Sequence, residues 1–140
     1  EEVAEVIRHL QPDRLGHGVK SAYDEKTMGM LRERGITLEL CPTSNLNSRV
    51  VSGRDEFARN IDTFHKHGVR YTINTDGPEM LKTYIRDEMA SLARHGILSV
   101  EQQEQAAAWA REASFVEGAD DVPLPQRTPA TRRQIEREEA

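Results

Sequence analysis

The sequence predicts an α/β fold in which three short parallel strands alternate with helices. Three short segments, residues 13–15, 36–40 and 69–73, are strand candidates, and each leads through polar residues into a helical pattern. Strands that alternate with helices run parallel and connect through right-handed crossovers. The 140 residues suffice for one ordinary domain, but a complete eight-unit barrel takes roughly 200 or more.

The first part of the chain contributes a helix, a strand and a second helix. A helix over residues 1–10 has its apolar residues on one side: Val3, Val6, Ile7 and Leu10. Pro12 breaks it, and residues 13–15 form the first strand. The second helix covers residues 23–34 and ends at Gly35.

The middle of the chain repeats this order. Residues 36–40 form a strand and 45–53 a polar loop. Residues 54–67 form a helix that ends at Gly68, and its apolar residues follow the i, i+4, i+7 spacing of one helix face: Phe57, Ile61 and Phe64. Residues 69–73 form the third strand.

Two more helices and a polar tail complete the pattern. Pro78 fits the first turn of a helix that reaches about His95, with an apolar stripe of Met80, Leu81, Tyr84, Ile85, Met89 and Leu92. Ser99 and Gln102 match a capping box that starts the last helix. After Gly118 the chain is rich in Asp, Pro, Arg and Glu, so residues 119–140 are expected to be a mostly disordered tail.

Three parallel strands on their own would leave two exposed sheet edges. They are instead the number expected in the last three-eighths of a (β/α)8 barrel, so residues 1–118 are interpreted as a partial barrel domain. The chain also starts without Met, inside a helical pattern, which suggests a piece of a longer protein.

Composition excludes several functional classes. The formal net charge of −5 argues against a general nucleic-acid binder. With one cysteine, Cys41, no internal disulfide can form, and a reducing, cytoplasmic location is expected. No apolar run approaches the about 18 residues of a membrane-spanning helix. Nothing in the pattern indicates an oligomeric state.

Two strand ends carry residues suited to chemistry. His17 stands between Gly16 and Gly18, which keep its ring uncrowded, although such glycines are also ordinary turn residues. Asp76 follows the third strand and precedes Pro78. Its carboxylate suits a metal ligand, a general base or a cap of the following helix.

The remaining candidates are weaker. Cys41, Ser44 and Asn45 follow the second strand, where a buried cysteine and a polar turn are favoured over a catalytic cysteine. His65 and His67 do not face each other at i, i+2 spacing and fit better as partners of the helix dipole. The His-x-Glu and Pro-Cys-x-x-Cys pattern of cytidine-type zinc deaminases is absent, as are phosphate and dinucleotide loops.

Together the three strand ends resemble the adenosine/adenine deaminase family, within the metal-dependent amidohydrolase superfamily of (β/α)8 barrels. The matching segments are Arg14-Leu15-Gly16-His17-Gly18, then Leu38-Glu39-Leu40-Cys41-Pro42-Thr43-Ser44-Asn45, and Asn74-Thr75-Asp76-Gly77-Pro78. Their order and spacing agree with the family over roughly residues 1–117, the final third of its barrel.

The resemblance implies roles for individual positions. His17, at the end of the sixth barrel strand, corresponds to the catalytic histidine, and Asp76, at the end of the eighth, to the carboxylate ligand of a single Zn²⁺. Cys41, Ser44 and Asn45 would shape the pocket. Gly77 stands where the family commonly has a second Asp, which is associated with hydrogen bonding to the purine imidazole nitrogen.

The implied reaction is the Zn-dependent hydrolytic deamination of adenosine or a related purine, with ammonia released from C6. The partner would be a small purine nucleoside or base, with no nucleic acid and no membrane. The family's His-x-His pair, its further His ligand and its Glu lie outside this chain, so the chain alone is expected to be inactive. Two alternatives are a deaminase of a modified adenine compound and a truncated, non-catalytic remnant.

Overall fold

A computed structural model describes residues 2–118 of the protein; residue 1 and the expected tail, 119–140, lie outside the described residues. Its centre is a parallel sheet with the strand order β1-β2-β3, formed by Arg14–Gly16, Thr37–Leu40 and Tyr71–Ile73. In register, Leu15 pairs with Leu38, and Leu38 pairs with Tyr71. The predicted α/β class with parallel strands is therefore confirmed.

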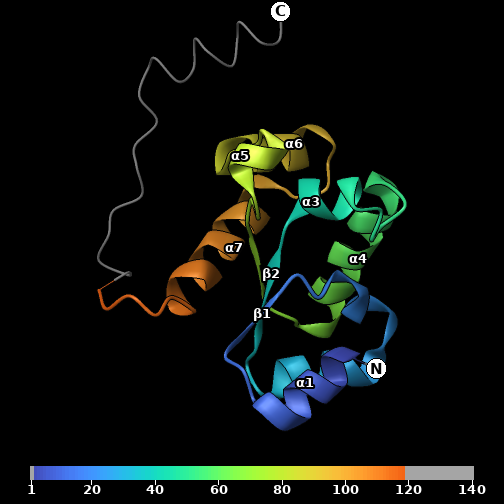
Figure 1. Ribbon diagram of the computed structural model, residues 1–140, viewed down its shortest axis with the longest axis vertical. Coiled ribbons are helices and arrows are strands. Elements are labelled where there is room, and N and C mark those ends of the chain that lie inside the picture. The colour runs from blue at the N-terminus through green and yellow to red at the C-terminus, as the bar shows by residue number, and fades with distance from the viewer. Residues whose placement is uncertain (1, 119–140) are drawn as a thin grey trace, which may run out of the picture.

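Helices surround this sheet (Figure 1). In chain order they are α1 (Glu2–Leu10), a 3-10 helix (Val19–Tyr23), α2 (Glu25–Glu33), α3 (Pro42–Asn47), α4 (Arg54–His67), α5 (Pro78–Leu81), α6 (Ile85–Arg94) and α7 (Val100–Glu112). Helices α4 and α7 lie on opposite sides of the strands in this view, while α3, α5 and α6 gather at the carboxyl ends of the strands. No helix within residues 2–118 is long and apolar enough to cross a membrane.

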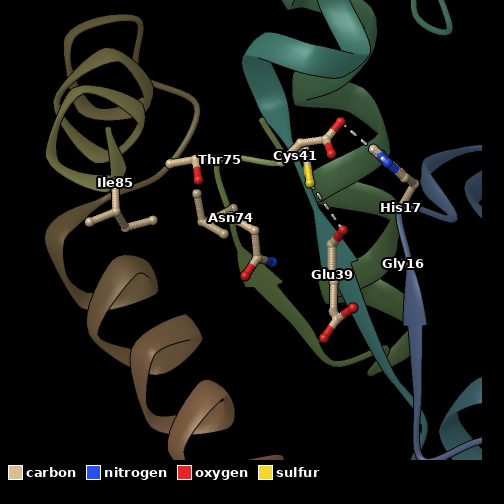
Figure 2. Close-up of a pocket in the computed structure, with 9 residues that line it drawn as sticks. Gly16, His17, Glu39, Cys41, Asn74, Thr75 and Ile85 are labelled. Carbon is tan, nitrogen blue, oxygen red and sulfur yellow. Dashed lines mark hydrogen bonds and ion pairs between the residues drawn. The ribbon is translucent and has the colours of Figure 1, made fainter. Parts of the chain in front are cut away.

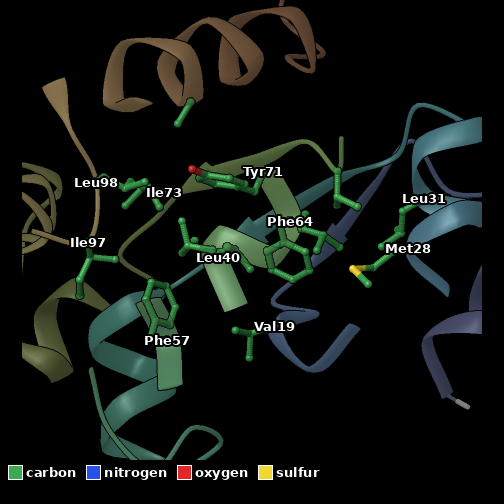
Figure 3. Close-up of a cluster of buried hydrophobic side chains, with 14 of the residues drawn as sticks. Val19, Met28, Leu31, Leu40, Phe57, Phe64, Tyr71, Ile73, Ile97 and Leu98 are labelled. Atoms are coloured by element: carbon green, nitrogen blue, oxygen red, sulfur yellow. The ribbon is translucent and has the colours of Figure 1, made fainter. Parts of the chain in front are cut away.

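The hydrophobic core lies between the sheet and helix α4 (Figure 3). Leu38 and Leu40 on β2 are fully buried, as are Phe57 and Phe64, the predicted inward residues of α4. Glu39, between the two leucines, points to the opposite face of the sheet because side chains alternate along a strand. That opposite face remains available for polar groups.

The predicted loop over residues 45–53 contains part of an extra helix. Helix α3 starts directly after β2, with Pro42 in its first turn, a position that proline favours. Because α3 begins at the strand end, it carries Ser44 and Asn45 on a short helix rather than on an irregular loop.

The predicted helix over residues 78–95 is interrupted. Lys82 adopts a left-handed backbone, with φ of 54°, which separates α5 from α6. The apolar stripe is split as a result: Leu92 is buried, whereas Met80 is 81% and Tyr84 60% exposed. In the first helix, Leu10 is likewise exposed rather than buried.

Candidate functional site

A cavity of about 540 Å³ opens at the carboxyl ends of the three strands, the usual place for a ligand in a parallel α/β fold. Its walls come from the three strand ends and from Ile85 of α6. Figure 2 shows His17 and Cys41 near the ends of their strands, with the side chains of Glu39 and Asn74 below them. The fold therefore brings the three separate strand-end motifs to one place.

His17 is held by its backbone and by Asn45. Its φ is 60°, a left-handed conformation that is uncommon for residues other than glycine, and its amide donates to the carbonyl of Glu39 over 2.8 Å. The ring Nδ1 lies 3.0 Å from Oδ1 of Asn45. With the Asn45 amide in this orientation its oxygen accepts, so the hydrogen of this contact belongs to Nδ1 of His17, and Nε2 faces the pocket.

Asp76 faces that nitrogen from the other side of the cavity. Nε2 of His17 lies 3.7 Å from Oδ2 of Asp76, and both side chains are nearly half exposed. Ser44 donates its hydroxyl hydrogen to the same Oδ2 over 2.7 Å. Asp76 also has a left-handed backbone, with φ of 62°. Strained backbones of this kind cluster at functional sites.

Helix α3 links the two groups, since consecutive residues contact them. Ser44 binds Asp76, and Asn45 binds His17. Asn45 is 1% exposed, and its Nδ2 has no hydrogen-bond partner among the described residues. One short helix therefore contacts both a histidine and a carboxylate at the strand ends.

Cys41 lines the cavity but is unsuited to nucleophilic attack. Its thiol is buried and donates to the Glu39 carbonyl over 3.6 Å. Burial, reinforced by the nearby carboxylates of Asp76, Glu88 and Glu39, raises the pKa of the Cys41 thiol to about 11. At neutral pH it remains a neutral thiol, whereas nucleophilic cysteines are thiolates.

Gly77 is not required by the backbone or by crowding. Its φ is −106°, which any residue adopts, and a Cβ built there would lie 3.6 Å from Cε of Met80, an ordinary contact distance. Gly18 differs, because its φ is 74° and a Cβ would come within 2.9 Å of Leu38. The fold therefore demands glycine at position 18 and leaves position 77 free to carry a side chain.

Glu39 and Asn74 also line the cavity; the sequence pointed to Asn74 only as a weaker candidate than Asp76, and to Glu39 only as part of a matching segment. Nε of Arg14 lies 3.1 Å from the Glu39 carboxylate, and Arg14 also donates to the carbonyl of Ala113 over 3.1 Å. The sequence did contain a signal for Glu39. A charged residue between two leucines of a buried strand must face the other side of the sheet, away from the hydrophobic core.

The described residues do not complete a metal site. Within residues 2–118, no group of three His, Cys, Asp or Glu side chains could hold an ion. His17 and Asp76 are the two such side chains that meet in the cavity across 3.7 Å. A protein-bound Zn²⁺ usually has at least three protein ligands, so further ligands would have to come from elsewhere.

Comparison with known proteins places the chain. The family model described as adenosine deaminase matches residues 1–125. The chain belongs to the adenosine deaminase family. The resemblance seen in the three strand-end motifs is thereby confirmed.

Curated relatives in the adenosine deaminase family carry more than one activity in their names. Aminodeoxyfutalosine deaminase of Streptomyces coelicolor is 45% identical over 66% of this chain and 23% of its own length. The aminodeoxyfutalosine deaminase of Streptomyces avermitilis is 39% identical over 85% of this chain and 33% of its own length. Adenosine deaminase of Escherichia coli is 35% identical over 93% of this chain and 38% of its own length. The chain therefore spans well under half of the length of these relatives.

A solved structure supports the fold. The crystal structure of an adenine deaminase from Arthrobacter aurescens aligns with 99% of this chain and 40% of that chain, with a TM-score of 0.75. Sequence identity is 23%, so this likeness concerns the arrangement of strands and helices alone.

Proposed function

We propose that this chain supplies the last three β/α units of a (β/α)8 barrel that hydrolytically deaminates adenosine or a related purine. The observation that carries the proposal is the pairing of His17 and Asp76 across 3.7 Å at the ends of β1 and β3, in a chain of the adenosine deaminase family. The short span relative to its relatives agrees with a barrel completed by further segments.

A Zn²⁺ ion fits this site as far as this chain contributes to it. Both described contacts of the Asp76 carboxylate use Oδ2, which leaves the lone pairs of Oδ1 for a cation. Asp76 would be the ligand from this chain, and the other ligands would come from outside it. When bound, the ion lowers the pKa of a water molecule and so makes a nucleophile available near neutral pH.

The chain's own residues would handle the proton and the geometry. Nε2 of His17 accepts a proton from the attacking water, while Asn45 holds Nδ1–H and thereby fixes the tautomer. Ser44 keeps the Asp76 carboxylate turned toward that water. Water adds its oxygen to C6 of the purine, the C6–N bond breaks, and ammonia leaves with the transferred proton.

A modified adenine compound is the second candidate substrate. The aminodeoxyfutalosine deaminases are 45% and 39% identical to this chain, against 35% for the adenosine deaminase of Escherichia coli. Gly77 also lacks the side chain that adenosine deaminases commonly use there, although the fold has space for one. The identities favour a modified adenine compound, and Gly77 favours recognition of the purine through contacts other than a second Asp.

The test uses the natural full-length gene product. Its metal content is measured, and ammonia release is followed with adenosine, adenine and aminodeoxyfutalosine. We expect about one Zn per chain and turnover of at least one substrate, with His17→Ala and Asp76→Ala losing activity by at least about 100-fold. Thr63→Ala, which removes an exposed hydroxyl bonded only to its own helix, is the control. Turnover unaffected by either site variant would contradict the proposal.

Gly77→Asp tests the substrate preference separately. If position 77 sets specificity, the variant changes the ratio of kcat/KM for adenosine to that for aminodeoxyfutalosine. Gly77→Ala is the matched control, because it adds a Cβ without a hydrogen-bonding group. An unchanged ratio in both variants would mean that position 77 does not select the substrate.

A further inference from the structure

Glu88 is a buried carboxylate outside the cavity at the strand ends. It lies in α6 and is 1% exposed, yet it forms no ion pair within residues 2–118. Its oxygens instead accept from the backbone amide of Thr43 and from the hydroxyl of Thr83, both over 3.3 Å. A carboxylate buried without a cation is unfavourable, so its position calls for an explanation.

The Thr43 contact serves the start of helix α3. The first amides of a helix have no partner within the helix, and they are usually satisfied by the side chain of the N-cap residue. Here the N-cap is Cys41, which makes no such hydrogen bond, and Pro42 occupies the first turn. Glu88 supplies the missing acceptor from α6, a distant element in the chain.

Helix α3 carries the two residues that orient the proposed active site. The amide that Glu88 holds belongs to Thr43, and the next two residues are Ser44, which binds Asp76, and Asn45, which binds His17. Three successive residues thus connect one buried carboxylate to both site groups. A rotation or shift of this helix would move both site contacts together.

The second contact of Glu88 strengthens the same connection. Thr83 lies in the short segment between α5 and α6, where Lys82 has the left-handed backbone. Helix α5 starts two residues after Asp76. Glu88 therefore connects the segment that follows Asp76 to helix α3, whose Ser44 binds Asp76.

We propose that Glu88 is a positioning residue, which fixes helix α3 so that Ser44 and Asn45 hold Asp76 and His17 in a reactive arrangement. This inference rests on the proposed deaminase function. Glu88 touches neither site group; it acts through the amide of Thr43. A cavity of about 230 Å³ lies beside it, with walls that include Thr43, Leu46 and Leu92, so shortening the side chain gives α3 room to move.

Three substitutions separate the parts of this role. Glu88→Gln keeps an oxygen that accepts from Thr43, and Thr83 can accept from the new amide group. Glu88→Asp keeps the carboxylate but shortens the side chain by one methylene, which moves the carboxylate away from the Thr43 amide. Glu88→Ala removes the acceptor altogether. Asp87→Ala is the control, because Asp87 caps α6 through the amide of Tyr84 and its described contacts do not include α3.

In the natural full-length protein, we expect Glu88→Ala and Glu88→Asp to lower kcat by about 10- to 100-fold, with a much smaller effect on KM. Glu88→Gln restores kcat to within a few-fold, and Asp87→Ala leaves it unchanged at temperatures well below unfolding. In a double-mutant cycle, Glu88→Asp has a smaller effect on kcat when Ser44 is already Ala, because both act through the same contact.

A second measurement does not depend on turnover. Nitrogen chemical shifts of the His17 ring report whether Nδ1 carries the hydrogen. We expect the Nδ1–H form in the parent and in Glu88→Gln, and a loss of its preference in Glu88→Asp. If the protein deaminates none of the substrates, these shifts still decide the role of Glu88. Unchanged His17 shifts and unchanged kcat in Glu88→Asp, with only a lower melting temperature, would overturn the proposal.

Discussion

The hydroxyl of Ser44 is one of the groups that contact Asp76 directly in the candidate site. Its 2.7 Å hydrogen bond to Oδ2 of Asp76 involves a charged acceptor, and such bonds contribute more than neutral ones. We expect Ser44→Ala in the full-length protein to lower kcat/KM by about tenfold. Steady-state kinetics with the best substrate measures this, and a variant with parental kcat/KM would show that Asp76 is oriented by other groups.

The two glycines near the site give opposite predictions for stability. Gly18→Ala places a Cβ 2.9 Å from fully buried Leu38 and in a left-handed backbone, so it should destabilise the protein by about 1–3 kcal/mol. Gly77→Ala meets neither obstacle and should change stability by less than about 0.5 kcal/mol. Denaturant unfolding compares them, and equal losses would mean that the environments of the glycines do not differ as described.

At the scale of residues, the sequence indicated which side chains lie at the carboxyl ends of the strands. It did not indicate which of these side chains form hydrogen bonds with one another. The strand before Asp76 was recognisable from its apolar residues, and the strand before His17 from its place between two helical patterns. Their side chains were expected to lie close together because the carboxyl ends of parallel strands share one sheet edge. The bond from Asn45 to His17 and the cap from Glu88 were not predicted, because each joins elements whose relative position depends on packing rather than on local pattern.

Among the elements, β3 is connected to α4 and α7 by a partly buried chain of polar side chains. The hydroxyl of Tyr71 lies 2.6 Å from Nε2 of His65, whose Nδ1 lies 3.1 Å from Nε2 of Gln102. Trp109 of α7 packs edge-on against the Tyr71 ring at 5.6 Å. His65 was interpreted from the sequence as a partner of the helix dipole, and the structure instead turns it inward to join three elements.

Removing the central hydroxyl should loosen these elements together. Tyr71→Phe leaves the ring packing intact but deprives the half-buried His65 nitrogen of its partner, and we expect a loss of about 1–2 kcal/mol. Tyr84→Phe, which removes a hydroxyl from an exposed side chain, is the control. Denaturant unfolding measures both, and similar values for the two variants would contradict a structural role for the His65 contact.

The link between α6 and α3 carries a pH signature. Burial raises the pKa of Glu88 above its ordinary value of 4.5, although the bonds from Thr43 and Thr83 partly oppose this. A carboxyl group with a raised folded-state pKa favours folding below its unfolded pKa and loses that contribution as the pH rises. Glu88→Gln should therefore raise the melting temperature most at pH 7–8 and progressively less towards pH 4.5.

Thermal unfolding of Glu88→Gln and the parent across this range checks the sign. Glu79→Gln makes the same change of net charge at an exposed position of α5 and serves as the reference. If the gain in melting temperature from Glu88→Gln grew as the pH fell, burial would not be the dominant influence on the pKa of Glu88.

The positions of strands and long helices followed from the sequence, whereas two local features did not. Helix α4 matches the predicted residues 54–67 because its apolar spacing and Gly68 are strong signals. The break between α5 and α6 at Lys82 was not predicted, because no glycine or proline marks it in the sequence. Helix α3 was missed because its six residues are too few to show a period, although Pro42 marked its start.

On the scale of the whole molecule, the described part of the chain has open surfaces. Strands β1 and β3 are the edges of its sheet, and Met80, Tyr84 and Ile85 expose apolar side chains in α5 and at the start of α6. In the barrel that we propose, further strands would pair with these edges. The open surfaces and the incomplete set of metal ligands thus have the same explanation.

The 140-residue chain expressed alone should therefore associate and show no deaminase turnover. Exposed edges and apolar patches favour association, and Asp76 alone cannot hold a catalytic metal in the usual way. Size-exclusion chromatography with light scattering, and an ammonia assay in added Zn²⁺, provide the two measurements. A monomer with a sharp cooperative melt, or measurable turnover, would contradict this expectation.

The left-handed backbones of His17 and Asp76 have a consequence for protein engineering. A left-handed conformation costs most non-glycine residues about 1–2 kcal/mol and costs Asp and His less, whereas Gly adopts it without steric cost. Selection of variants for heat resistance alone would therefore tend to enrich Gly at positions 17 and 76, and would remove the two side chains that we propose for catalysis in the same step. A library intended to improve this protein needs a turnover screen alongside the thermal one.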